Sequence, residues 1–237
     1  MQKNDCLNEV AEVAQMLWNK GWAERNGGNI VVRLDQDPTL PFAPTPLPCG
    51  CEVPHLAKLQ FYCKGTGSRM RDIARDPLKY GCTIEILPDG KHYRLALGST
   101  TRPTSELAAH LLLHNDFVAT HSAMQATLHT HPTCLVAMSH HFRPSTSEAY
   151  TETLHSMIPE ARLFVPRGMG YTPYLEPGSH ELAAATLEEI RNHDIVLWNR
   201  HGTLSVGTTL MDAFDFTDIM EKSADIFIKS CIVKSAF

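Results

Sequence analysis

The segment "TLHTHPT", residues 127–133, places His129 and His131 two positions apart in an otherwise apolar run. The run "ATLHTH" that begins at residue 126 predicts a strand, and side chains at i and i+2 of a strand point to the same side. Both imidazoles would then face one point, as zinc requires, with roughly 2.0–2.1 Å to each nitrogen. Two hydrogen-bonded core histidines would fit the same pattern, so this segment alone leaves both interpretations open.

A third histidine follows another predicted strand. "DIVLW", residues 194–198, leads directly into "NRHG", which contains His201 and a glycine that lets the turn approach a ligand closely. Three imidazoles leave one zinc position open, as catalytic sites need. Zinc hydrolases of the metallo-β-lactamase type continue a His-x-His with Asp-His, whereas Pro132 and Thr133 follow here. The pattern therefore favours a catalytic zinc site built from these three histidines, and not a hydrolase of that type.

Another trio lies on the helix predicted over residues 104–117, "TSELAAHLLLHNDF". Glu106, His110 and His114 occupy positions i, i+4 and i+8, one above another. The first and the last lie about 12 Å apart along a helix axis, too far for one ion. We therefore predict that Glu106 joins the metal site and that His110 and His114 are packing or supporting groups.

The loop "CGCEVPH", residues 49–55, offers an alternative metal site. Cys49, Cys51 and His55 could form a structural zinc knuckle. The spacing is unusual, however, and a matched second pair is missing, so we expect ordinary loop thiols there.

Three short motifs favour phosphate binding. "ERNGGN", residues 24–29, and "KGTGSR", residues 64–69, are Gly-rich turns whose backbone amides can form a concave nest for an anion. "PTSE", residues 103–106, starts a helix, where free amides and the helix dipole favour phosphate. Each motif is weak alone, because most such turns are only turns. Beside three histidines, the set predicts a phosphorylated metabolite as the ligand.

The composition is that of a globular metabolic protein. The chain has 237 residues, 43% of them hydrophobic, which is enough for one large α/β domain over residues 1–237. A net charge of −5 gives no electrostatic footprint for nucleic acid or an anionic membrane. No signal peptide and no apolar run of roughly 18 residues is found, and seven scattered cysteines indicate reduced thiols. We expect a cytoplasmic protein whose partners are small molecules and copies of itself.

Helices and strands alternate too irregularly for a doubly wound order, which predicts a mixed sheet between helical layers. Residues 36–60 carry six prolines and predict an irregular excursion inside the domain. The turn "PDGK", residues 88–91, predicts a hairpin. The remaining predicted elements are helices over residues 6–20, 179–193 and 210–234, and strands in "NIVVRL", "KLQFYC" and "RLFVP", residues 29–34, 58–63 and 162–166.

The order of these motifs resembles the class II aldolases of the fuculose-phosphate aldolase and adducin superfamily, and within it the rhamnulose-1-phosphate aldolases. "KGWAERNGGN", the Pro-rich excursion before "KGTGS", "PTSEL", the His-x-His, "NRHG" and "MEKSAD" carry the resemblance over nearly the whole chain. It implies a layered α/β fold with a mixed, largely antiparallel sheet, a C4 homotetramer with sites at subunit interfaces, and one Zn²⁺ per subunit. The implied reaction is retro-aldol cleavage of a ketose 1-phosphate, most closely L-rhamnulose 1-phosphate, to dihydroxyacetone phosphate and L-lactaldehyde.

The resemblance also implies individual roles. Zinc would lie on His129, His131 and His201. Glu106 would be the fourth ligand and would become the acid or base once substrate displaces it. Glu160, in "MIPEARLFVPRGMG", matches a second functional carboxylate. The residues implied to hold the substrate phosphate are Asn26, Gly28, Asn29, Thr66, Gly67, Thr104 and Ser105.

The chain departs from the family pattern at Lys64 and Ser68, where threonine and lysine are usual. No lysine stands out as a Schiff-base nucleophile. The main alternative is a sister enzyme of the same fold: a fuculose-phosphate aldolase, a pentulose-phosphate epimerase or a methylthioribulose-phosphate dehydratase. The Pro-rich excursion and "ERNGG" argue against it. A non-enzymatic adducin-like interaction domain conflicts with the retention of three histidines and Glu106, and an unrelated zinc hydrolase is the third alternative.

Overall fold

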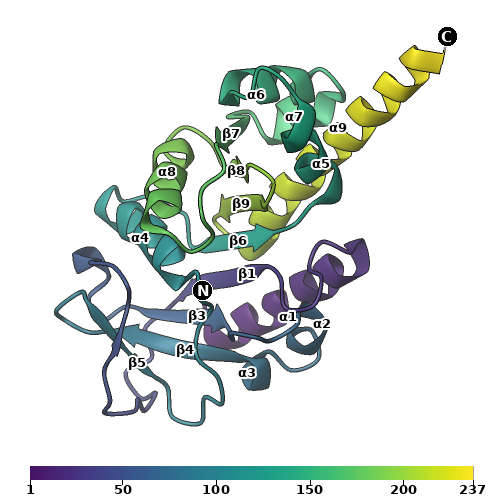
Figure 1. Ribbon diagram of the computed structural model, residues 1–237. Coiled ribbons are helices and arrows are strands. Elements are labelled where there is room, and N and C mark those ends of the chain that lie inside the picture. The colour runs from purple at the N-terminus through teal and green to yellow at the C-terminus, as the bar shows by residue number, and fades with distance from the viewer. Residues whose placement is uncertain (237) are drawn as a thin grey trace.

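One mixed β-sheet runs through residues 1–236, the part of the chain that the computed structural model describes (Figure 1). Phe237, the last residue of the predicted domain, lies outside the described residues. The strands are β1 (Asn29–Leu34), β2 (Leu47–Pro48), β3 (Gln60–Lys64), β4 (Gly81–Ile86), β5 (His92–Leu95), β6 (Ala126–Thr130), β7 (Met169–Thr172), β8 (Ile195–Trp198) and β9 (Gly202–Gly207). Their order across the sheet is β2-β5-β4-β3-β1-β6-β9-β8-β7, and within the described residues only β7 and β8 pair in parallel.

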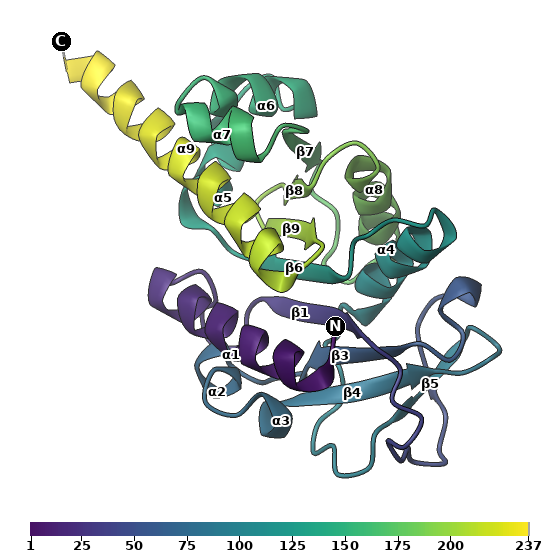
Figure 2. The same cartoon turned by 180° about the vertical axis from the view of Figure 1, so that it is seen from behind.

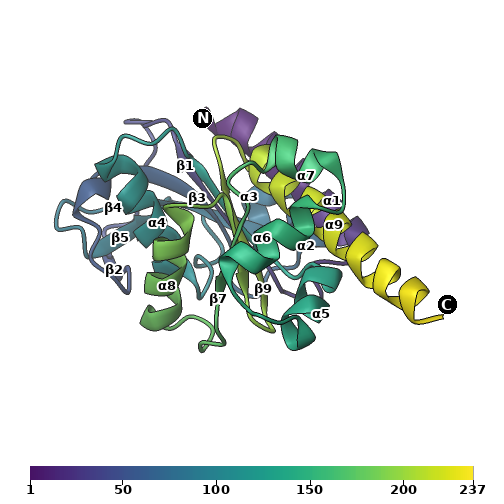
Figure 3. The ribbon, with the colours of Figure 1, turned by 90° about the horizontal axis from the view of Figure 1, so that it is seen from above.

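Helices cover both faces of this sheet. The helices are α1 (Lys3–Lys20), α2 (Met70–Ile73), α3 (Pro77–Tyr80), α4 (Leu107–Ala119), α5 (Thr133–His141), α6 (Ser147–His155), α7 (Pro159–Phe164), α8 (His180–Ile190) and α9 (Leu210–Ala236), with a 3-10 turn at Pro54–Leu56. Figure 2 and Figure 3 show α1 and α9 on one face, α4 and α8 on the other, and the end of α9 extending beyond the body of the molecule. None of the described helices is long and apolar enough to cross a membrane.

The central strands are buried along almost their whole length because helices cover both of their sides. In β1, "NIVVRL", only Arg33 is not fully buried, and all four residues of β8, "IVLW", are buried. Leu17 and Phe214 pack on one side of the sheet, whereas Leu113 and Leu182 pack on the other. These two apolar layers confirm the predicted α/β class with a mixed, largely antiparallel sheet.

The first helix ends as its sequence predicts. Gly21 adopts a left-handed backbone with φ of 73°, and its amide donates to the carbonyl of Trp18 at 3.1 Å. The amide of Trp22 donates to the carbonyl of Leu17, also at 3.1 Å. This closure turns the chain sharply into the "ERNGGN" loop, so the helix end fixes where that loop starts.

The strand predicted in "RLFVP" is wrong. Residues Pro159–Phe164 form the short helix α7, with proline in its first turn, where the missing amide costs no hydrogen bond. Leu163 and Phe164 are 70% and 54% exposed, whereas a buried strand would hide such side chains. Leu163 and Phe164 therefore lie at the surface, Val165 is buried beside them in the core, and the run is not part of the sheet.

The helix predicted from residue 104 begins three residues later, at Leu107. Thr104 is held by the neighbouring strands, because its hydroxyl donates to the side chain of Asn29 and its amide donates to the carbonyl of Lys64 at 3.0 Å. Glu106 becomes the residue before the helix, and its side chain makes no capping bond. Its carboxylate is consequently available to the strand ends beside it.

Four central strands of the sheet have ends that lie side by side. β3 ends at Lys64 and β6 at Thr130, whereas β1 begins at Asn29 and β9 at Gly202. Antiparallel pairing makes these ends neighbours, with Asn29 opposite His129. The residues that follow or precede these ends therefore lie close together in space, although they are distant in sequence.

Candidate active site

Three histidines converge at these strand ends. One ring nitrogen from each of His129, His131 and His201 lies within 4.8 Å of the others, and no other group of three or more potential metal ligands occurs among residues 1–236. His129 is 1% exposed, while His131 and His201 are partly exposed toward a cavity. The two residues of the His-x-His therefore point to one place, as strand geometry predicts.

The hydrogen bonds of the rings fix which nitrogens are free. Nδ1 of His129 lies 2.8 Å from the carbonyl oxygen of Thr203, and Nδ1 of His131 lies 2.7 Å from a carboxylate oxygen of Glu24. Each oxygen is an acceptor, so each neutral ring carries its proton on Nδ1 and a lone pair on Nε2. The two Nε2 atoms are 3.2 Å apart. Two facing lone pairs are unfavourable unless a cation lies between them, so this donor set fits a metal ion better than a pair of core histidines.

The surroundings of His129 and His201 favour the uncharged form of both rings. Burial lowers the pKa of His129 well below its usual value, and its neighbours His131 and His201 add to the effect. Burial, again with His131, lowers the pKa of His201 to about 4. Neutral imidazole is the form that binds metals, so His129 and His201 are in their ligating state at neutral pH.

Glycines allow the histidine loops to approach each other. A Cβ on Gly202 would lie 2.3 Å from the carbonyl oxygen of Thr130 and 3.0 Å from Cε1 of His129. A Cβ on Gly27 would lie 3.0 Å from Cε1 of His131. The glycine in "NRHG" therefore has the function that its sequence predicts, namely close approach of the turn.

Glu106 lies beside the three rings. Its carboxylate oxygens are 3.8 Å from Nε2 of His129 and 4.0 Å from Nε2 of His201. The carboxylate accepts a hydrogen bond from the amide of Asn29, and the amide oxygen of Asn29 accepts one from the hydroxyl of Thr104. This chain of bonds holds the carboxylate in one orientation. Burial raises the pKa of Glu106, partly offset by His131, Asn29 and Lys64, so the group is poised to accept a proton.

All the residues predicted to bind phosphate line one cavity with the histidines. Its volume is about 150 Å³, and its wall is almost entirely polar side chains and glycine backbone. The amides of Gly28, Gly67 and Ser105 donate to no acceptor among the described residues. Gly28 and Gly67 have φ of 75° and 74°, a left-handed backbone that glycine adopts without strain. The predicted residues in this wall are Asn26, Gly28, Asn29, Thr66, Gly67, Thr104 and Ser105.

Two residues at the site were missed in the sequence. Glu24 fixes the His131 ring, and Lys64 lines the cavity as the last residue of β3. Lys64 is 1% exposed, and its ammonium donates to the carbonyl of Asn26 at 2.9 Å. Burial lowers the pKa of Lys64 to about 8, against the opposing effect of Glu106. The position of Lys64 next to "GTG" was the available signal, but the burial of a lysine cannot be predicted from the sequence.

Other candidates lie elsewhere. Glu160 is exposed on α7 and is not part of the cavity wall of its own chain. Cys49 and Cys51 form no metal cluster with His55, and burial raises the pKa of the two thiols to about 12 and about 11. These thiols are therefore protonated at neutral pH and are poor metal ligands as they stand.

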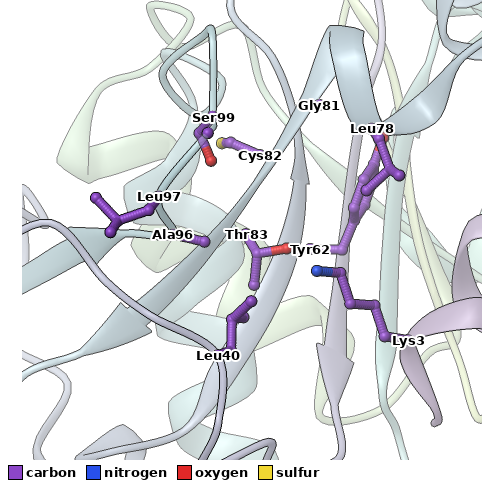
Figure 4. Close-up of a pocket in the computed structure, with 11 residues that line it drawn as sticks. Lys3, Leu40, Tyr62, Leu78, Gly81, Cys82, Thr83, Ala96, Leu97 and Ser99 are labelled. Atoms are coloured by element: carbon purple, nitrogen blue, oxygen red, sulfur yellow. The ribbon is translucent and has the colours of Figure 1, made fainter.

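A second cavity lies near the start of α1. Its volume is about 220 Å³, and Lys3, Leu40, Tyr62 and Leu78 contribute to its wall (Figure 4). The hydroxyl of Tyr62 donates to the carbonyl of Pro77 at 2.9 Å, so this phenol has a structural partner. The cavity shares no wall residue with the histidine site and contains no cluster of catalytic groups.

Comparison with known proteins agrees with this geometry. Residues 8–228 match the family model described as class II aldolase and adducin N-terminal domain. The chain is 45% identical to a rhamnulose-1-phosphate aldolase of Bacteroides thetaiotaomicron over 94% of this chain and 84% of that protein. It is 36% identical to the enzyme of the same name from Salmonella paratyphi B over 90% of this chain and 80% of that one.

Solved structures agree as well. A sugar-phosphate aldolase from Thermotoga maritima matches with a TM-score of 0.87 at 31% identity, covering 97% of this chain and 96% of that one. L-fuculose-1-phosphate aldolase from Thermus thermophilus, at 16% identity, has the same fold with a TM-score of 0.63 and covers 98% of each chain. The chain therefore belongs to the class II aldolase and adducin family, and it is an aldehyde-lyase of that family.

Proposed function

We propose that this chain catalyses the zinc-dependent retro-aldol cleavage of L-rhamnulose 1-phosphate to dihydroxyacetone phosphate and L-lactaldehyde. The observation that carries the proposal is the convergence of three imidazoles and one carboxylate beside a polar cavity with free amides. The 45% identical relative named rhamnulose-1-phosphate aldolase supports the choice of sugar.

In this proposal, His129, His131 and His201 hold zinc, with Glu106 as a further ligand before substrate arrives. A bound zinc ion would act as a Lewis acid that stabilises the negative charge developing on the substrate's carbonyl oxygen. The lowered pKa values of His129 and His201 support this assignment, as do the Nδ1 hydrogen bonds that orient the rings of His129 and His131.

Glu106 then transfers the proton at C3 of the dihydroxyacetone phosphate part of the sugar. Breaking the C3–C4 bond of the sugar removes the proton of the C4 hydroxyl, turns C4 into the aldehyde carbon of L-lactaldehyde and leaves an enediolate of dihydroxyacetone phosphate. The enediolate must then gain a proton at C3, which balances the proton lost from the hydroxyl. In the reverse direction, the carboxylate removes that proton. The raised pKa of Glu106 and its fixed orientation by Asn29 suit a group that alternates between the two protonation states.

The amides and hydroxyls of the three Gly- and Thr-rich turns bind the phosphate. Asn26, Gly28 and Asn29 come from the first turn, and Thr66 and Gly67 from the second. Thr104 and Ser105 add the segment before α4, whose N-terminal dipole favours an anion. Holding the phosphate orients the sugar so that its reacting carbons lie near Glu106.

Residues 1–237 act as one domain in this proposal, and four copies form a tetramer in the cytoplasm, where sugar phosphates are metabolised. Large exposed apolar side chains near the outer helices support an assembly: Leu163 and Phe164 on α7, and Ile232 and Val233 on α9. Glu160 is exposed on the same helix α7. It takes part in catalysis only if α7 of one copy reaches the cavity of another, as the family's assembly implies.

The test is release of dihydroxyacetone phosphate from a panel of ketose 1-phosphates. We expect L-rhamnulose 1-phosphate to be cleaved faster than L-fuculose 1-phosphate, with activity removed by a chelator and restored by zinc. Comparable or reversed rates would assign the chain to a sister specificity. No dihydroxyacetone phosphate from any member of the panel would refute the proposed reaction.

A further inference from the structure

Lys64 is a buried lysine without a carboxylate partner. It is 1% exposed, and no ion pair within 4.0 Å is formed by its ammonium among the described residues. Its one protein acceptor is the carbonyl of Asn26, at 2.9 Å. An ammonium has three N–H donors, and burying one with unused donors is costly. Such a group is retained where an anion completes its hydrogen bonds.

The same residue joins two of the anion-binding segments. Its side chain holds the carbonyl of Asn26, while its backbone carbonyl accepts the amide of Thr104 at 3.0 Å. In the same turn the amide of Gly27 donates to the carbonyl of Glu24 at 2.8 Å, whereas the next amide, that of Gly28 in the cavity wall, donates to no acceptor among the described residues. Lys64 therefore sets the orientation of the first turn relative to the segment before α4.

Among the described residues of the cavity wall, Lys64 is also the only lysine or arginine. A phosphate monoester carries a charge of about −1.5 to −2 at pH 7. Glu106 adds a further negative charge to the same small space when it is ionised. Free amides and a helix dipole each supply only a fraction of a positive charge, so a full positive charge here has a large effect.

We propose that Lys64 is the positioning and charge-compensating residue of the phosphate subsite, fixing the Asn26 turn and selecting phosphorylated over unphosphorylated ligands. This inference rests on the phosphate-binding part of the proposed function. It assigns a role to a residue at which the chain departs from its family's usual threonine. It does not depend on which sugar is cleaved.

The experiment measures binding of inorganic phosphate by calorimetry to the zinc-loaded wild type and to Lys64→Met and Lys64→Arg. Methionine keeps the length of the side chain without charge, whereas arginine keeps the charge. Lys91→Met, on the exposed β4–β5 turn, is the matched control. We expect the dissociation constant for phosphate to rise about 10- to 100-fold in Lys64→Met, as for a lost hydrogen bond to a charged group. Lys64→Arg should recover much of this loss, and Lys91→Met should not differ from the wild type.

Zinc content and kinetics separate positioning from general damage. In Lys64→Met we expect an unchanged zinc content and a KM for the sugar phosphate that rises more than kcat falls. If the methionine variant does not fold, Lys64→Gln, whose amide can still donate to Asn26, replaces it. Phosphate affinity equal to wild type in the uncharged variants, loss of zinc together with phosphate, or no phosphate binding by the wild type would each overturn the inference. Failure of the proposed reaction appears separately, as absence of dihydroxyacetone phosphate from the wild type.

Discussion

Two sets of histidines in this molecule differ in their surroundings more than in their chemistry. His110 and His114 lie on the face of α4 that packs on the sheet, and both are 0% exposed. Nδ1 of His110 lies 2.7 Å from the hydroxyl of Thr127, and His114 packs against Phe61 with ring centroids 5.1 Å apart. The second set, at the strand ends, faces a polar cavity instead.

The difference teaches what makes a histidine a ligand. Strand β6 serves both sets, since Thr127 contacts the α4 histidines and His129, two residues later, belongs to the site. The α4 rings are separated by the rise of the helix and surrounded by apolar groups, so their unpaired nitrogens do not converge on one ligand. The strand-end rings converge because the end of β6, with His129 and His131, lies beside the turn between β8 and β9, with His201. Convergence on a cavity, and not burial or spacing alone, separates the two sets.

The largest effect on zinc content and cleavage rate is expected when one of the strand-end histidines is removed. His129→Ala should lose most of the zinc and reduce cleavage by well over the 10- to 100-fold that removal of a group supporting a metal ligand typically costs. His114→Phe, in the other set, should keep its zinc. The measurement is metal content by atomic absorption beside the cleavage rate. A full complement of zinc in His129→Ala, or zinc on Cys49 and Cys51, would refute the metal assignment.

The next effect separates ligand from base at Glu106. Three imidazoles already make a competent zinc site, so Glu106→Gln should keep most of its zinc. A neutral amide cannot accept the C3 proton, and loss of a general base typically costs about 10²–10⁴-fold in rate. The readout is exchange of the C3 proton of dihydroxyacetone phosphate in deuterated water. Glu52→Gln, which neutralises an exposed carboxylate away from the site, is the control. Wild-type exchange in zinc-replete Glu106→Gln would transfer the role of base to another group, with Glu160 the first to test.

The smallest effect concerns stability and the buried set. Burial lowers the pKa of His114 from 6.5 to about 3. Below pH 6.5 the imidazole of His114 therefore binds a proton in the unfolded chain, whereas in the folded chain it stays neutral down to about pH 3. The contribution of neutral His114 to the unfolding free energy is fully present above pH 6.5. It is lost as the pH falls from 6.5 to about 3, by up to about 1.4 kcal/mol per pH unit for this one group.

His114→Phe should flatten that dependence. Phenylalanine suits the contacts with Phe61 and Phe117 and cannot take up a proton. Urea unfolding at several pH values between 4 and 7 measures the change, with the exposed His140→Gln as the control. An equally steep loss of unfolding free energy in His114→Phe would show that other groups cause the acid sensitivity.

Much of this fold could be predicted because local signals agreed with the global structure. The helical spacing before Gly21, the Asp-Gly hairpin and the apolar runs of β1 and β8 each appear where the sequence predicts them. Strand β9, "GTLSVG", was missed because glycine, serine and threonine interrupt its apolar pattern. Its backbone pairs with β6 and β8 on either side, and this tertiary context makes it a strand.

Part of the site could also be predicted, where local sequence signals agree with the final structure. The two ligands of "HTH" share a strand, so their common direction follows from geometry alone. His201 was predicted from its Gly-containing turn directly after a strand, and Glu106 from its place near the start of a helix. Neither signal is geometric, since no local pattern tells which strand ends become neighbours. The burial of Lys64 had no sequence signal, because a strand-terminal lysine is usually solvated. The exposure of Glu160 on α7 was likewise hidden by an apolar run that looked like a strand.

The contact of Gly202 with Thr130 has a practical consequence for protein engineering. Even a methyl group at position 202 would overlap the facing carbonyl oxygen, so alanine there would push β6 and β9 apart next to His129. A mutagenic library aimed at new aldehyde acceptors should therefore randomise the cavity's exposed side chains and leave this backbone position untouched. A deep mutational scan should find position 202 as intolerant as the histidines themselves, although its side chain is a single hydrogen atom.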